Sequence, residues 1–207
     1  MAQPKITAIG AATLDTFLIG KALRAKRDVR THDYVTQFPL GEKIEIDQVV
    51  FSTGGGASNA AVTFARQGLN SKYVGKIGDD LPGREILAAL RSEKVNTHDV
   101  AVDLDGATGY STILLAPRGE RTILVYRGAS EDLNAADLKL SKLDSDWVYL
   151  SSLAGNLSLL AKILTNAKEK KTFTVSLSWD ASKTNNAEGS IKWVSGEQVV
   201  RSPIVIF

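Results

Sequence analysis

The sequence contains no cysteine among its 207 residues. This absence excludes a disulfide framework, cysteine-ligated zinc and catalysis by a thiolate. A soluble chain of this length buries roughly 70% of the surface that its unfolded form exposes, so its core needs neither disulfides nor metal. The lack of cysteine is typical of a reducing compartment, and we therefore predict a cytoplasmic protein.

A surplus of charge of either sign is also lacking. Lys and Arg number 25 and Asp and Glu 23, which gives a net charge of +2. Because so small a net charge creates no general field around the molecule, we expect neither nucleic acid nor a membrane as a partner. The densest basic run is Lys21–Arg30, with five Lys and Arg. Such runs are usually solvated faces, and we predict no role for this one beyond the rim of a phosphate site.

Long apolar segments are missing as well. The stretch from Gln48 to Ala65 carries no charge and is as long as a membrane span, but it contains three consecutive glycines and several hydroxyl and amide side chains. Such a surface is unsuited to lipid, so we interpret the stretch as a strand, a loop and a helix. The first 14 residues are interrupted by Thr7, Gly10 and Thr13, and we expect no signal peptide there.

What the sequence does contain is an alternation of strands and helices. The patterns predict strands over 5–10, 43–47, 49–52, 72–77, 110–115, 121–126, 146–150 and 172–177, and helices over 57–67, 82–93 and 157–168. This order favours an α/β fold with a largely parallel sheet covered by helices. The strands over 110–115 and 121–126 flank a turn with Pro117 and Gly119, which predicts a hairpin and a small β appendage.

The C-terminal part is harder to interpret. Residues 182–196 are polar and read as irregular, whereas the chain stops at the apolar run 204–207, which is typical of an internal strand. We expect either that the sheet is cut short of its natural fold or that this edge pairs with a partner.

The strongest local motif is Gly-Gly-Gly-Ala-Ser-Asn over residues 54–59, where a strand is expected to meet a helix. Glycines let backbone N–H groups approach a ligand, and a helix N-terminus favours hydroxyl-rich or anionic groups. A tight turn without a ligand is the alternative. The motif is no Walker loop, and its match to a dinucleotide fingerprint is weak because Asn59 stands where the third glycine belongs.

Other candidates are isolated. Asp15, expected just beyond the first strand, lies where open α/β sheets bind ligands, and with Asn59 it would grip the hydroxyls of a sugar; otherwise it is a turn or cap residue. Arg127 follows the hairpin and would meet a phosphate or a surface acid. His32 and His98 lack metal-ligand spacing.

Taken as a set, these residues resemble the ribokinase-like, PfkB-type carbohydrate kinases. The resemblance covers residues 6–177 and rests on Ile9-Gly10 with Asp15, the motif Gly54–Ala61, Val74–Asp80, Pro82-Gly83 and Tyr126–Ala129. It implies a three-layer αβα domain with a small β-strand lid, here over about 34–52 and 108–127. It also implies ATP with magnesium as cofactors, a sugar or nucleoside as substrate, and a homodimer formed through the lid.

The resemblance further implies a set of substrate-binding residues, which are Thr13, Asp15, Gly54, Gly55, Asn59 and Arg127. Asp15 resembles the family's acceptor of sugar hydroxyls, and the glycines with Asn59 resemble its substrate-binding loop. Thr13 stands where some sugar kinases of this type have Asn, so the resemblance specifies no particular sugar.

The sequence also departs from the family's pattern. It has no Gly-Ala-Gly-Asp motif, whose amides and Asp carry out phosphoryl transfer in the family, and neither an Asn-Pro after residue 175 nor the later Asn-x-x-Glu. We therefore assign no catalytic residue, expect the nucleotide-binding part to be missing from a single domain of residues 1–207, and expect no kinase activity. Two hypotheses remain: the acceptor-binding part of a sugar or nucleoside kinase, and a non-catalytic polyol-binding or dimerising module.

Overall fold

A computed structural model describes residues 3–140, 143–151, 153–166, 187–195 and 198–206, with side chains up to residue 166. Contacts divide the chain into two compact units, Met1–Lys168 and Glu169–Phe207. The extension of one domain over all 207 residues stays a prediction.

The core of the first unit is a parallel sheet. It consists of β1 (Lys5–Ile9), β6 (Asn70–Val74) and β11 (Trp147–Leu150) in the order β11-β1-β6. A second parallel pair is formed by β7 (Lys76–Gly78) and β8 (Ala101–Asp103). The strand predicted over 72–77 is therefore two strands, interrupted at Gly75. Parallel neighbours require long crossover connections, which the helices supply.

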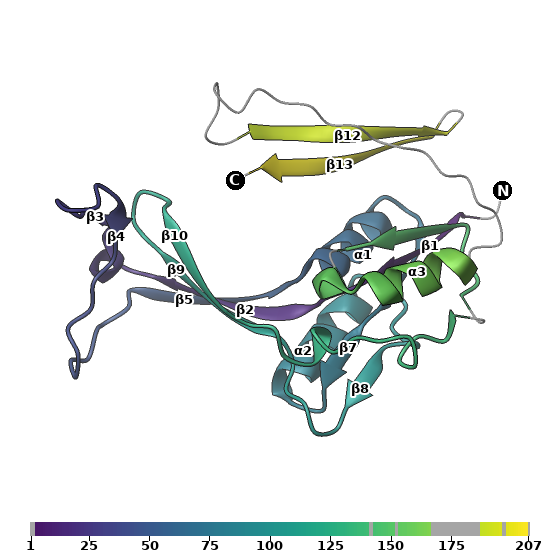
Figure 1. Cartoon of the computed structure of the whole chain (residues 1–207), viewed down its shortest axis with the longest axis horizontal. Coiled ribbons are helices and arrows are strands. Elements are labelled where there is room, and N and C mark those ends of the chain that lie inside the picture. The colour runs from purple at the N-terminus through teal and green to yellow at the C-terminus, as the bar shows by residue number, and fades with distance from the viewer. Residues whose placement is uncertain (1–2, 141–142, 152, 167–186, 196–197, 207) are drawn as a thin grey trace. The chain divides into compact units, whose positions relative to one another are not determined.

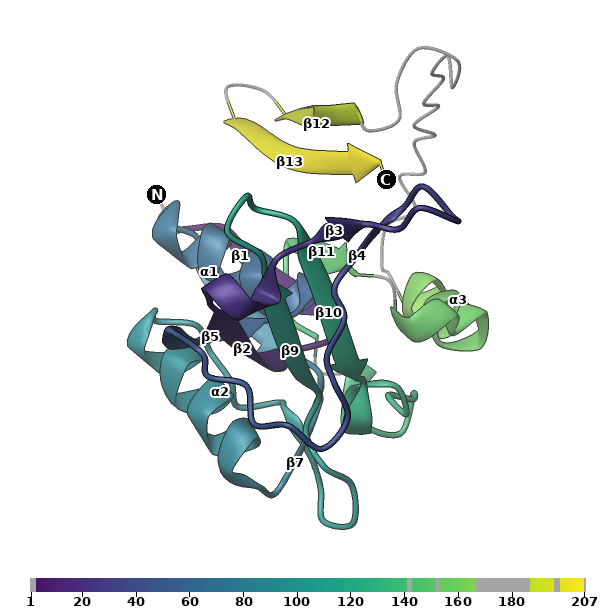
Figure 2. The same ribbon diagram turned by 90° about the vertical axis from the view of Figure 1, so that its left-hand side faces the viewer.

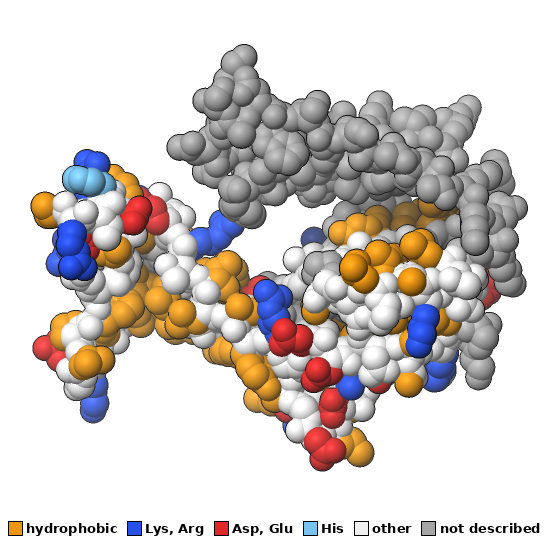
Figure 3. All heavy atoms as spheres, in the orientation of Figure 1, with side chains coloured by type: hydrophobic (Ala, Val, Ile, Leu, Met, Phe, Trp, Pro, Cys, Tyr) orange, Lys and Arg blue, Asp and Glu red, His pale blue; other side chains and the backbone are white. Residues whose placement is uncertain are grey.

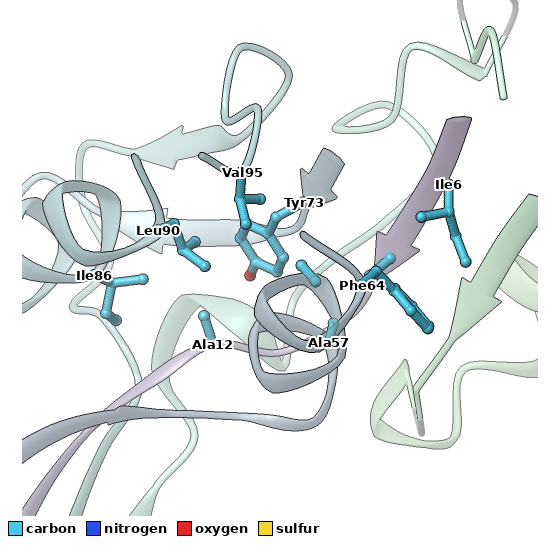
Figure 4. Packing of buried hydrophobic residues seen from close by; sticks show 10 residues of the cluster. Ile6, Ala12, Ala57, Phe64, Tyr73, Ile86, Leu90 and Val95 are labelled. Atoms are coloured by element: carbon cyan, nitrogen blue, oxygen red, sulfur yellow. The ribbon is translucent and has the colours of Figure 1, made fainter. Parts of the chain in front are cut away.

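Helices cover both faces of this sheet and make the three layers. The helices are α1 (Gly56–Arg66), α2 (Leu81–Ser92) and α3 (Leu157–Asn166). Side chains of α1 and α2 pack with Tyr73 in one apolar cluster (Figure 4), whereas those of α3 pack with Ile9 and Val74 in another. Figure 2 shows α1 and α2 on one side of the core and α3 on the other. The first two helices confirm the predicted ones to within a residue.

A four-stranded sheet, here called the lid, extends from the core (Figure 1). It contains β2 (Thr13–Ile19), β5 (Gln48–Gly54), β9 (Tyr110–Leu115) and β10 (Arg121–Tyr126), in the order β10-β9-β2-β5. A short hairpin of β3 (Lys26–Arg27) and β4 (Tyr34–Val35) stands at its far end. The predicted hairpin over 110–126 is confirmed by the pairing of β9 with β10.

Two predictions about the lid were incomplete. Strand β2 was not predicted, although it is central in the lid. The strand predicted over 43–47 is wrong, because residues 36–47 form loop and turn and β5 begins only at Gln48. Ile44 and Ile46 alternate with charged residues in this segment, but the segment pairs with no strand of the described part of the chain.

The second unit contains an antiparallel hairpin of β12 (Ala187–Ser195) and β13 (Gln198–Ile206). The irregular structure expected over 182–196 is therefore wrong for residues 187–195. The β-type side chains Ile191, Trp193 and Val194 favour a strand there more than its polar composition suggested. The apolar run at 204–206 is a strand as expected, and the strand predicted over 172–177 lies outside the described residues.

Candidate functional site at the root of the lid

Asp15 lies within β2, close to the point where the lid leaves the core. In the sheet register it stands opposite Ser52 of β5 and Ser111 of β9. The Thr13 hydroxyl, on the same face of β2, donates a hydrogen bond of 2.9 Å to Asp15 Oδ1. The half-buried carboxylate is thus held at the base of the sheet. Asp15 follows the first strand, β1, as predicted, but it lies within a second strand, because the chain resumes β structure at Thr13.

Gly54, the last residue of β5, allows the Asp15 carboxylate to approach. It pairs with Thr13, and a Cβ at Gly54 would overlap Asp15 Oδ2 and lie only 2.9 Å from Thr13 Oγ1. Any side chain at position 54 would therefore displace the carboxylate. The predicted residues Thr13, Asp15 and Gly54 consequently form one contiguous group of atoms.

The next residue, Gly55, turns the chain from the lid into α1. Its φ of 101° is a conformation that favours glycine, and a Cβ there would overlap the carbonyl oxygen of Ala11. The same carbonyl accepts a hydrogen bond of 3.3 Å from the Ala57 amide. The glycine motif therefore presses the first turn of α1 against the loop that joins β1 to β2.

Asn59 lies in the first turn of α1, where its backbone N–H donates to the Gly55 carbonyl at 3.0 Å. Its side chain is exposed, and within the described part of the chain no hydrogen bond joins it to Asp15. The structure thus leaves the amide group of Asn59 facing solvent beside the glycine turn. That Asn59 and Asp15 together hold the hydroxyls of a sugar stays a prediction.

Ser151 is a candidate that sequence reasoning missed. It follows β11 directly, and its amide donates to the Ile9 carbonyl of β1 at 3.0 Å. A Cβ built on Gly10 would lie 2.5 Å from Ser151 Oγ, and one built on Gly56 would lie 3.2 Å from it. The hydroxyl is therefore at the carboxyl edge of the parallel sheet, next to the start of α1. A polar residue after a predicted strand, the criterion that selected Asp15, would also have found it.

Arg127 comes to the same region through its backbone. It follows β10, and its carbonyl accepts a hydrogen bond of 2.7 Å from Ser130 Oγ. A Cβ added at Gly109 would lie 2.9 Å from that carbonyl oxygen and 3.1 Å from Thr13 Cγ2. Gly109 therefore lies between Arg127 and Thr13, where no side chain fits. The guanidinium itself is exposed, and among the described residues it has no ion-pair partner.

Asp80 fixes the turn that holds β2 in place. Its carboxylate caps α2 by accepting from the Gly83 amide at 2.9 Å, and it also accepts from the amide and hydroxyl of Thr108. Burial alone raises the pKa of this carboxyl, but these hydrogen bonds outweigh burial and hold the pKa below its ordinary value. Next in the chain, the Gly109 carbonyl accepts from the Leu14 amide at 3.0 Å. The start of α2 is thereby connected to β2.

The described residues offer no ready metal site. No group of three or more His, Asp or Glu side chains lies close enough together in this part of the chain to hold a metal ion. None of the described helices combines the length and the apolar character that crossing a membrane requires.

The profile of the pfkB family carbohydrate kinases matches residues 19–192. The chain belongs to this family. Its ribokinase-like α/β fold, with a lid of β-strands, confirms the predicted fold class. Two relatives and one solved structure illustrate what the pfkB resemblance covers.

A ribokinase of Dictyostelium discoideum is 29% identical over 170 residues, which is 81% of this chain and 49% of that protein. A 5-dehydro-2-deoxygluconokinase of Bacillus anthracis (strain CDC 684 / NRRL 3495) is 34% identical over 108 residues, 52% of this chain and 32% of that protein. The structure of ribokinase from Giardia lamblia superposes with a TM-score of 0.65 at 25% identity, over 80% of this chain and 51% of that one. The chain thus spans about half, or less, of the length of these pfkB relatives.

Proposed function

We propose that this chain carries the acceptor-binding part of an ATP-dependent sugar or nucleoside kinase, with Asp15 as the acceptor of the ligand's hydroxyl hydrogen bonds. The observation that carries the proposal is the carboxylate held by Thr13 directly above Gly54, at the root of the lid. Membership of the pfkB family supports a carbohydrate as the ligand.

The chemistry of the group suits a polyol. A carboxylate accepts several hydrogen bonds, and Thr13 occupies only part of the capacity of Asp15. Neighbouring hydroxyls of a sugar donate to the remaining lone pairs as charge-assisted hydrogen bonds, which are stronger than neutral ones. Gly54 makes room for the Asp15 carboxylate, and Gly55 lets the chain pass close to the Ala11 carbonyl. The side chains of Asn59 and Arg127 are exposed at the edge of the site.

The proposal assigns binding, and not phosphoryl transfer, to these residues. ATP and magnesium belong to the proposed reaction of a complete kinase, and no group of three or more His, Asp or Glu side chains among the described residues is placed to hold a metal ion. The sequence also has no Gly-Ala-Gly-Asp motif. We therefore name no catalytic residue in this chain.

Asp15→Asn tests the proposal. We expect it to weaken binding of the preferred sugar or nucleoside by about tenfold or more, because a charged hydrogen-bonding partner contributes roughly 1.5–3 kcal/mol. Isothermal titration of the purified chain against a panel of pentoses, hexoses and nucleosides identifies the ligand and then measures the variant.

Asp105→Asn is the matched control, since this exposed aspartate lies away from the lid root and the substitution removes the same charge. Equal affinity of Asp15→Asn and the wild type would remove Asp15 from the site. Acceptor-dependent ADP formation by the chain with Mg-ATP would contradict the assignment of binding alone.

A second function, dimerisation through the lid, is favoured by the apolar side chains that the lid exposes. Phe51, Leu124 and Tyr126 are each more than half exposed, and the strand register places all three on one face of the sheet. Figure 3 shows apolar side chains along the lid. A second copy of this chain is the partner we propose, because identical apolar faces cover one another in an isologous contact.

A further inference from the structure

The basic run at the end of the lid lines a cavity. Strand β2 leads into the short helix η1 (Lys21–Leu23) and then into β3. The cavity has a volume of about 340 Å³, is open to solvent, and is lined by Lys21, Ala22, Arg24, Lys26 and Gln37. Figure 3 shows Lys and Arg side chains at this end of the lid, with acidic and apolar side chains between them. The run predicted to be a solvated face is therefore folded around a concave surface.

Three cations, Lys21, Arg24 and Lys26, line the cavity. Among the described residues, none of Lys21, Arg24 and Lys26 forms an ion pair, whereas Lys72 and Lys76 in the core are each paired with an aspartate. Arg24 donates from Nε only to the backbone carbonyl of Lys21, at 3.2 Å. Their positive charge is consequently directed at solvent and at the cavity.

Two nearby aspartates, Asp47 and Asp28, accept hydrogen bonds from backbone amides. Asp47 Oδ2 accepts from the Lys21 amide at 2.9 Å, and Asp28 Oδ1 accepts from the amides of Arg30 and Thr31. Residues 21–35 contain five Lys or Arg and two Asp, so this segment carries +3 where the whole chain carries +2. A concave surface lined by one sign of charge concentrates ions of the opposite sign.

We propose that this cavity binds a small anion with two or more phosphate groups. Its volume lies at the lower end of small-molecule sites, which suits a compact ligand. Arg24 offers a planar fork of donors and the two lysines offer point charges, the combination used to hold phosphate oxygens. Because the cations come from η1, the residue after it and β3, a ligand with several anionic groups contacts all three at once. Gln37 adds an amide.

The proposal is tested by titrating the full chain with inorganic tripolyphosphate and, separately, with orthophosphate at fixed ionic strength. We expect tripolyphosphate to bind at least about tenfold more tightly, since each added charged hydrogen bond contributes on that scale. The combined variant Lys21→Gln, Arg24→Gln and Lys26→Gln should weaken tripolyphosphate binding on the order of a hundredfold. All three side chains are exposed, so the variant keeps its fold, and circular dichroism verifies this.

The matched control is Lys43→Gln, Lys94→Gln and Lys162→Gln, three exposed lysines that have no ion-pair partner in the described part of the chain and do not line the cavity. It removes the same net charge and should retain the wild-type affinity within about twofold. An equal loss in both variants would mean that tripolyphosphate responds only to net charge, and this would overturn the proposal. Absence of tripolyphosphate binding to the wild type would overturn it as well. Asp15→Asn should leave this affinity unchanged, which separates the cavity from the sugar site.

Discussion

A single hydroxyl, that of Tyr73, connects the buried core to the loop behind the site. Tyr73 is fully buried in the apolar cluster with α1 and α2 (Figure 4). Its hydroxyl donates to the Gly10 carbonyl at 3.0 Å. Burial raises the pKa of this phenol well above its ordinary value, so the hydroxyl keeps its proton and remains a donor. Gly10 begins the loop on which Gly55 rests, and the hydrogen bond therefore stabilises the floor of the site.

Tyr73→Phe should lower the free energy of unfolding by about 1–3 kcal/mol, because the ring still fills its space but the buried Gly10 carbonyl loses its side-chain donor. Urea denaturation followed by circular dichroism measures the change. Tyr149→Phe is the control. Tyr149 packs edge-to-face on Phe64, and its hydroxyl forms no hydrogen bond with any described residue. We expect it to change stability by less than about 0.5 kcal/mol. Equal stabilities of the two variants would contradict the role given to the Tyr73 hydroxyl.

At the residue scale, the sequence indicated some of the residues that meet at the site but not others. Asp15 and the glycines were found because their spacing forms a family motif, and the structure does place Thr13, Asp15 and Gly54 in contact. Ser151 lies 141 positions from Gly10 in the chain, and no local pattern indicates that the two meet. Contacts of this kind follow from parallel pairing of β11 with β1, which a single sequence does not specify.

At the scale of elements, the start of α2 and the turn before β9 behave as one unit. Asp80 joins them through its hydrogen bonds from Gly83 and Thr108. The lowered pKa of this carboxyl means that folding favours its ionised form. The stabilisation is complete above the pKa of the unfolded state, near pH 4, and is lost as the pH falls through the lower pKa of the folded state.

Asp80→Asn should therefore lower the unfolding free energy by about 1–2 kcal/mol at pH 7, and the difference from the wild type should shrink as the pH falls from 5 to 3. Thermal or urea denaturation across this range measures it. Asp79→Asn is the neighbouring control, since Asp79 pairs with Arg84 only at the exposed surface. Its effect should stay below about 1 kcal/mol at every pH. A pH-independent loss in Asp80→Asn would show that the charge of Asp80 is not what stabilises the turn.

Element prediction succeeded where periodicity was strong and failed where tertiary pairing decided the structure. The helices α1 and α2 and the hairpin β9–β10 were identified from apolar spacing and turn residues. Strand β2 was missed because only residues 10–12 separate it from β1, and Thr13 and Asp15 resemble a loop. Its β structure comes from pairing on both sides, with β5 and β9, and not from its own propensity.

At the scale of the whole molecule, the exposed apolar face of the lid predicts self-association. Leu124 is 58% exposed on β10 and pairs with Thr112 of β9 in the sheet. Leu124→Glu should convert a dimer into a monomer at micromolar concentration, because it places a charge at the centre of an apolar contact. Analytical ultracentrifugation measures the mass.

Val29→Glu is the control, since Val29 is 89% exposed in the loop between β3 and β4 and lies outside the four-stranded sheet. It should leave the mass unchanged. A wild-type chain that sediments as a monomer at tens of micromolar would contradict dimerisation through the lid. The same outcome would leave the sugar site untouched, because Thr13, Asp15 and Gly54 all come from one chain.

The placement of Asp15 within the lid has a consequence for how a ligand would leave. Strand β2 runs without interruption from Thr13 to Ile19, so the carboxylate belongs to the lid and not to the parallel sheet of the core. A rotation of the lid away from α1 would carry Thr13 and Asp15 with it and separate them from Asn59, which lies on α1. Opening of the lid and release of the ligand would then be coupled, because the strand that belongs to the lid also carries the carboxylate that holds the ligand.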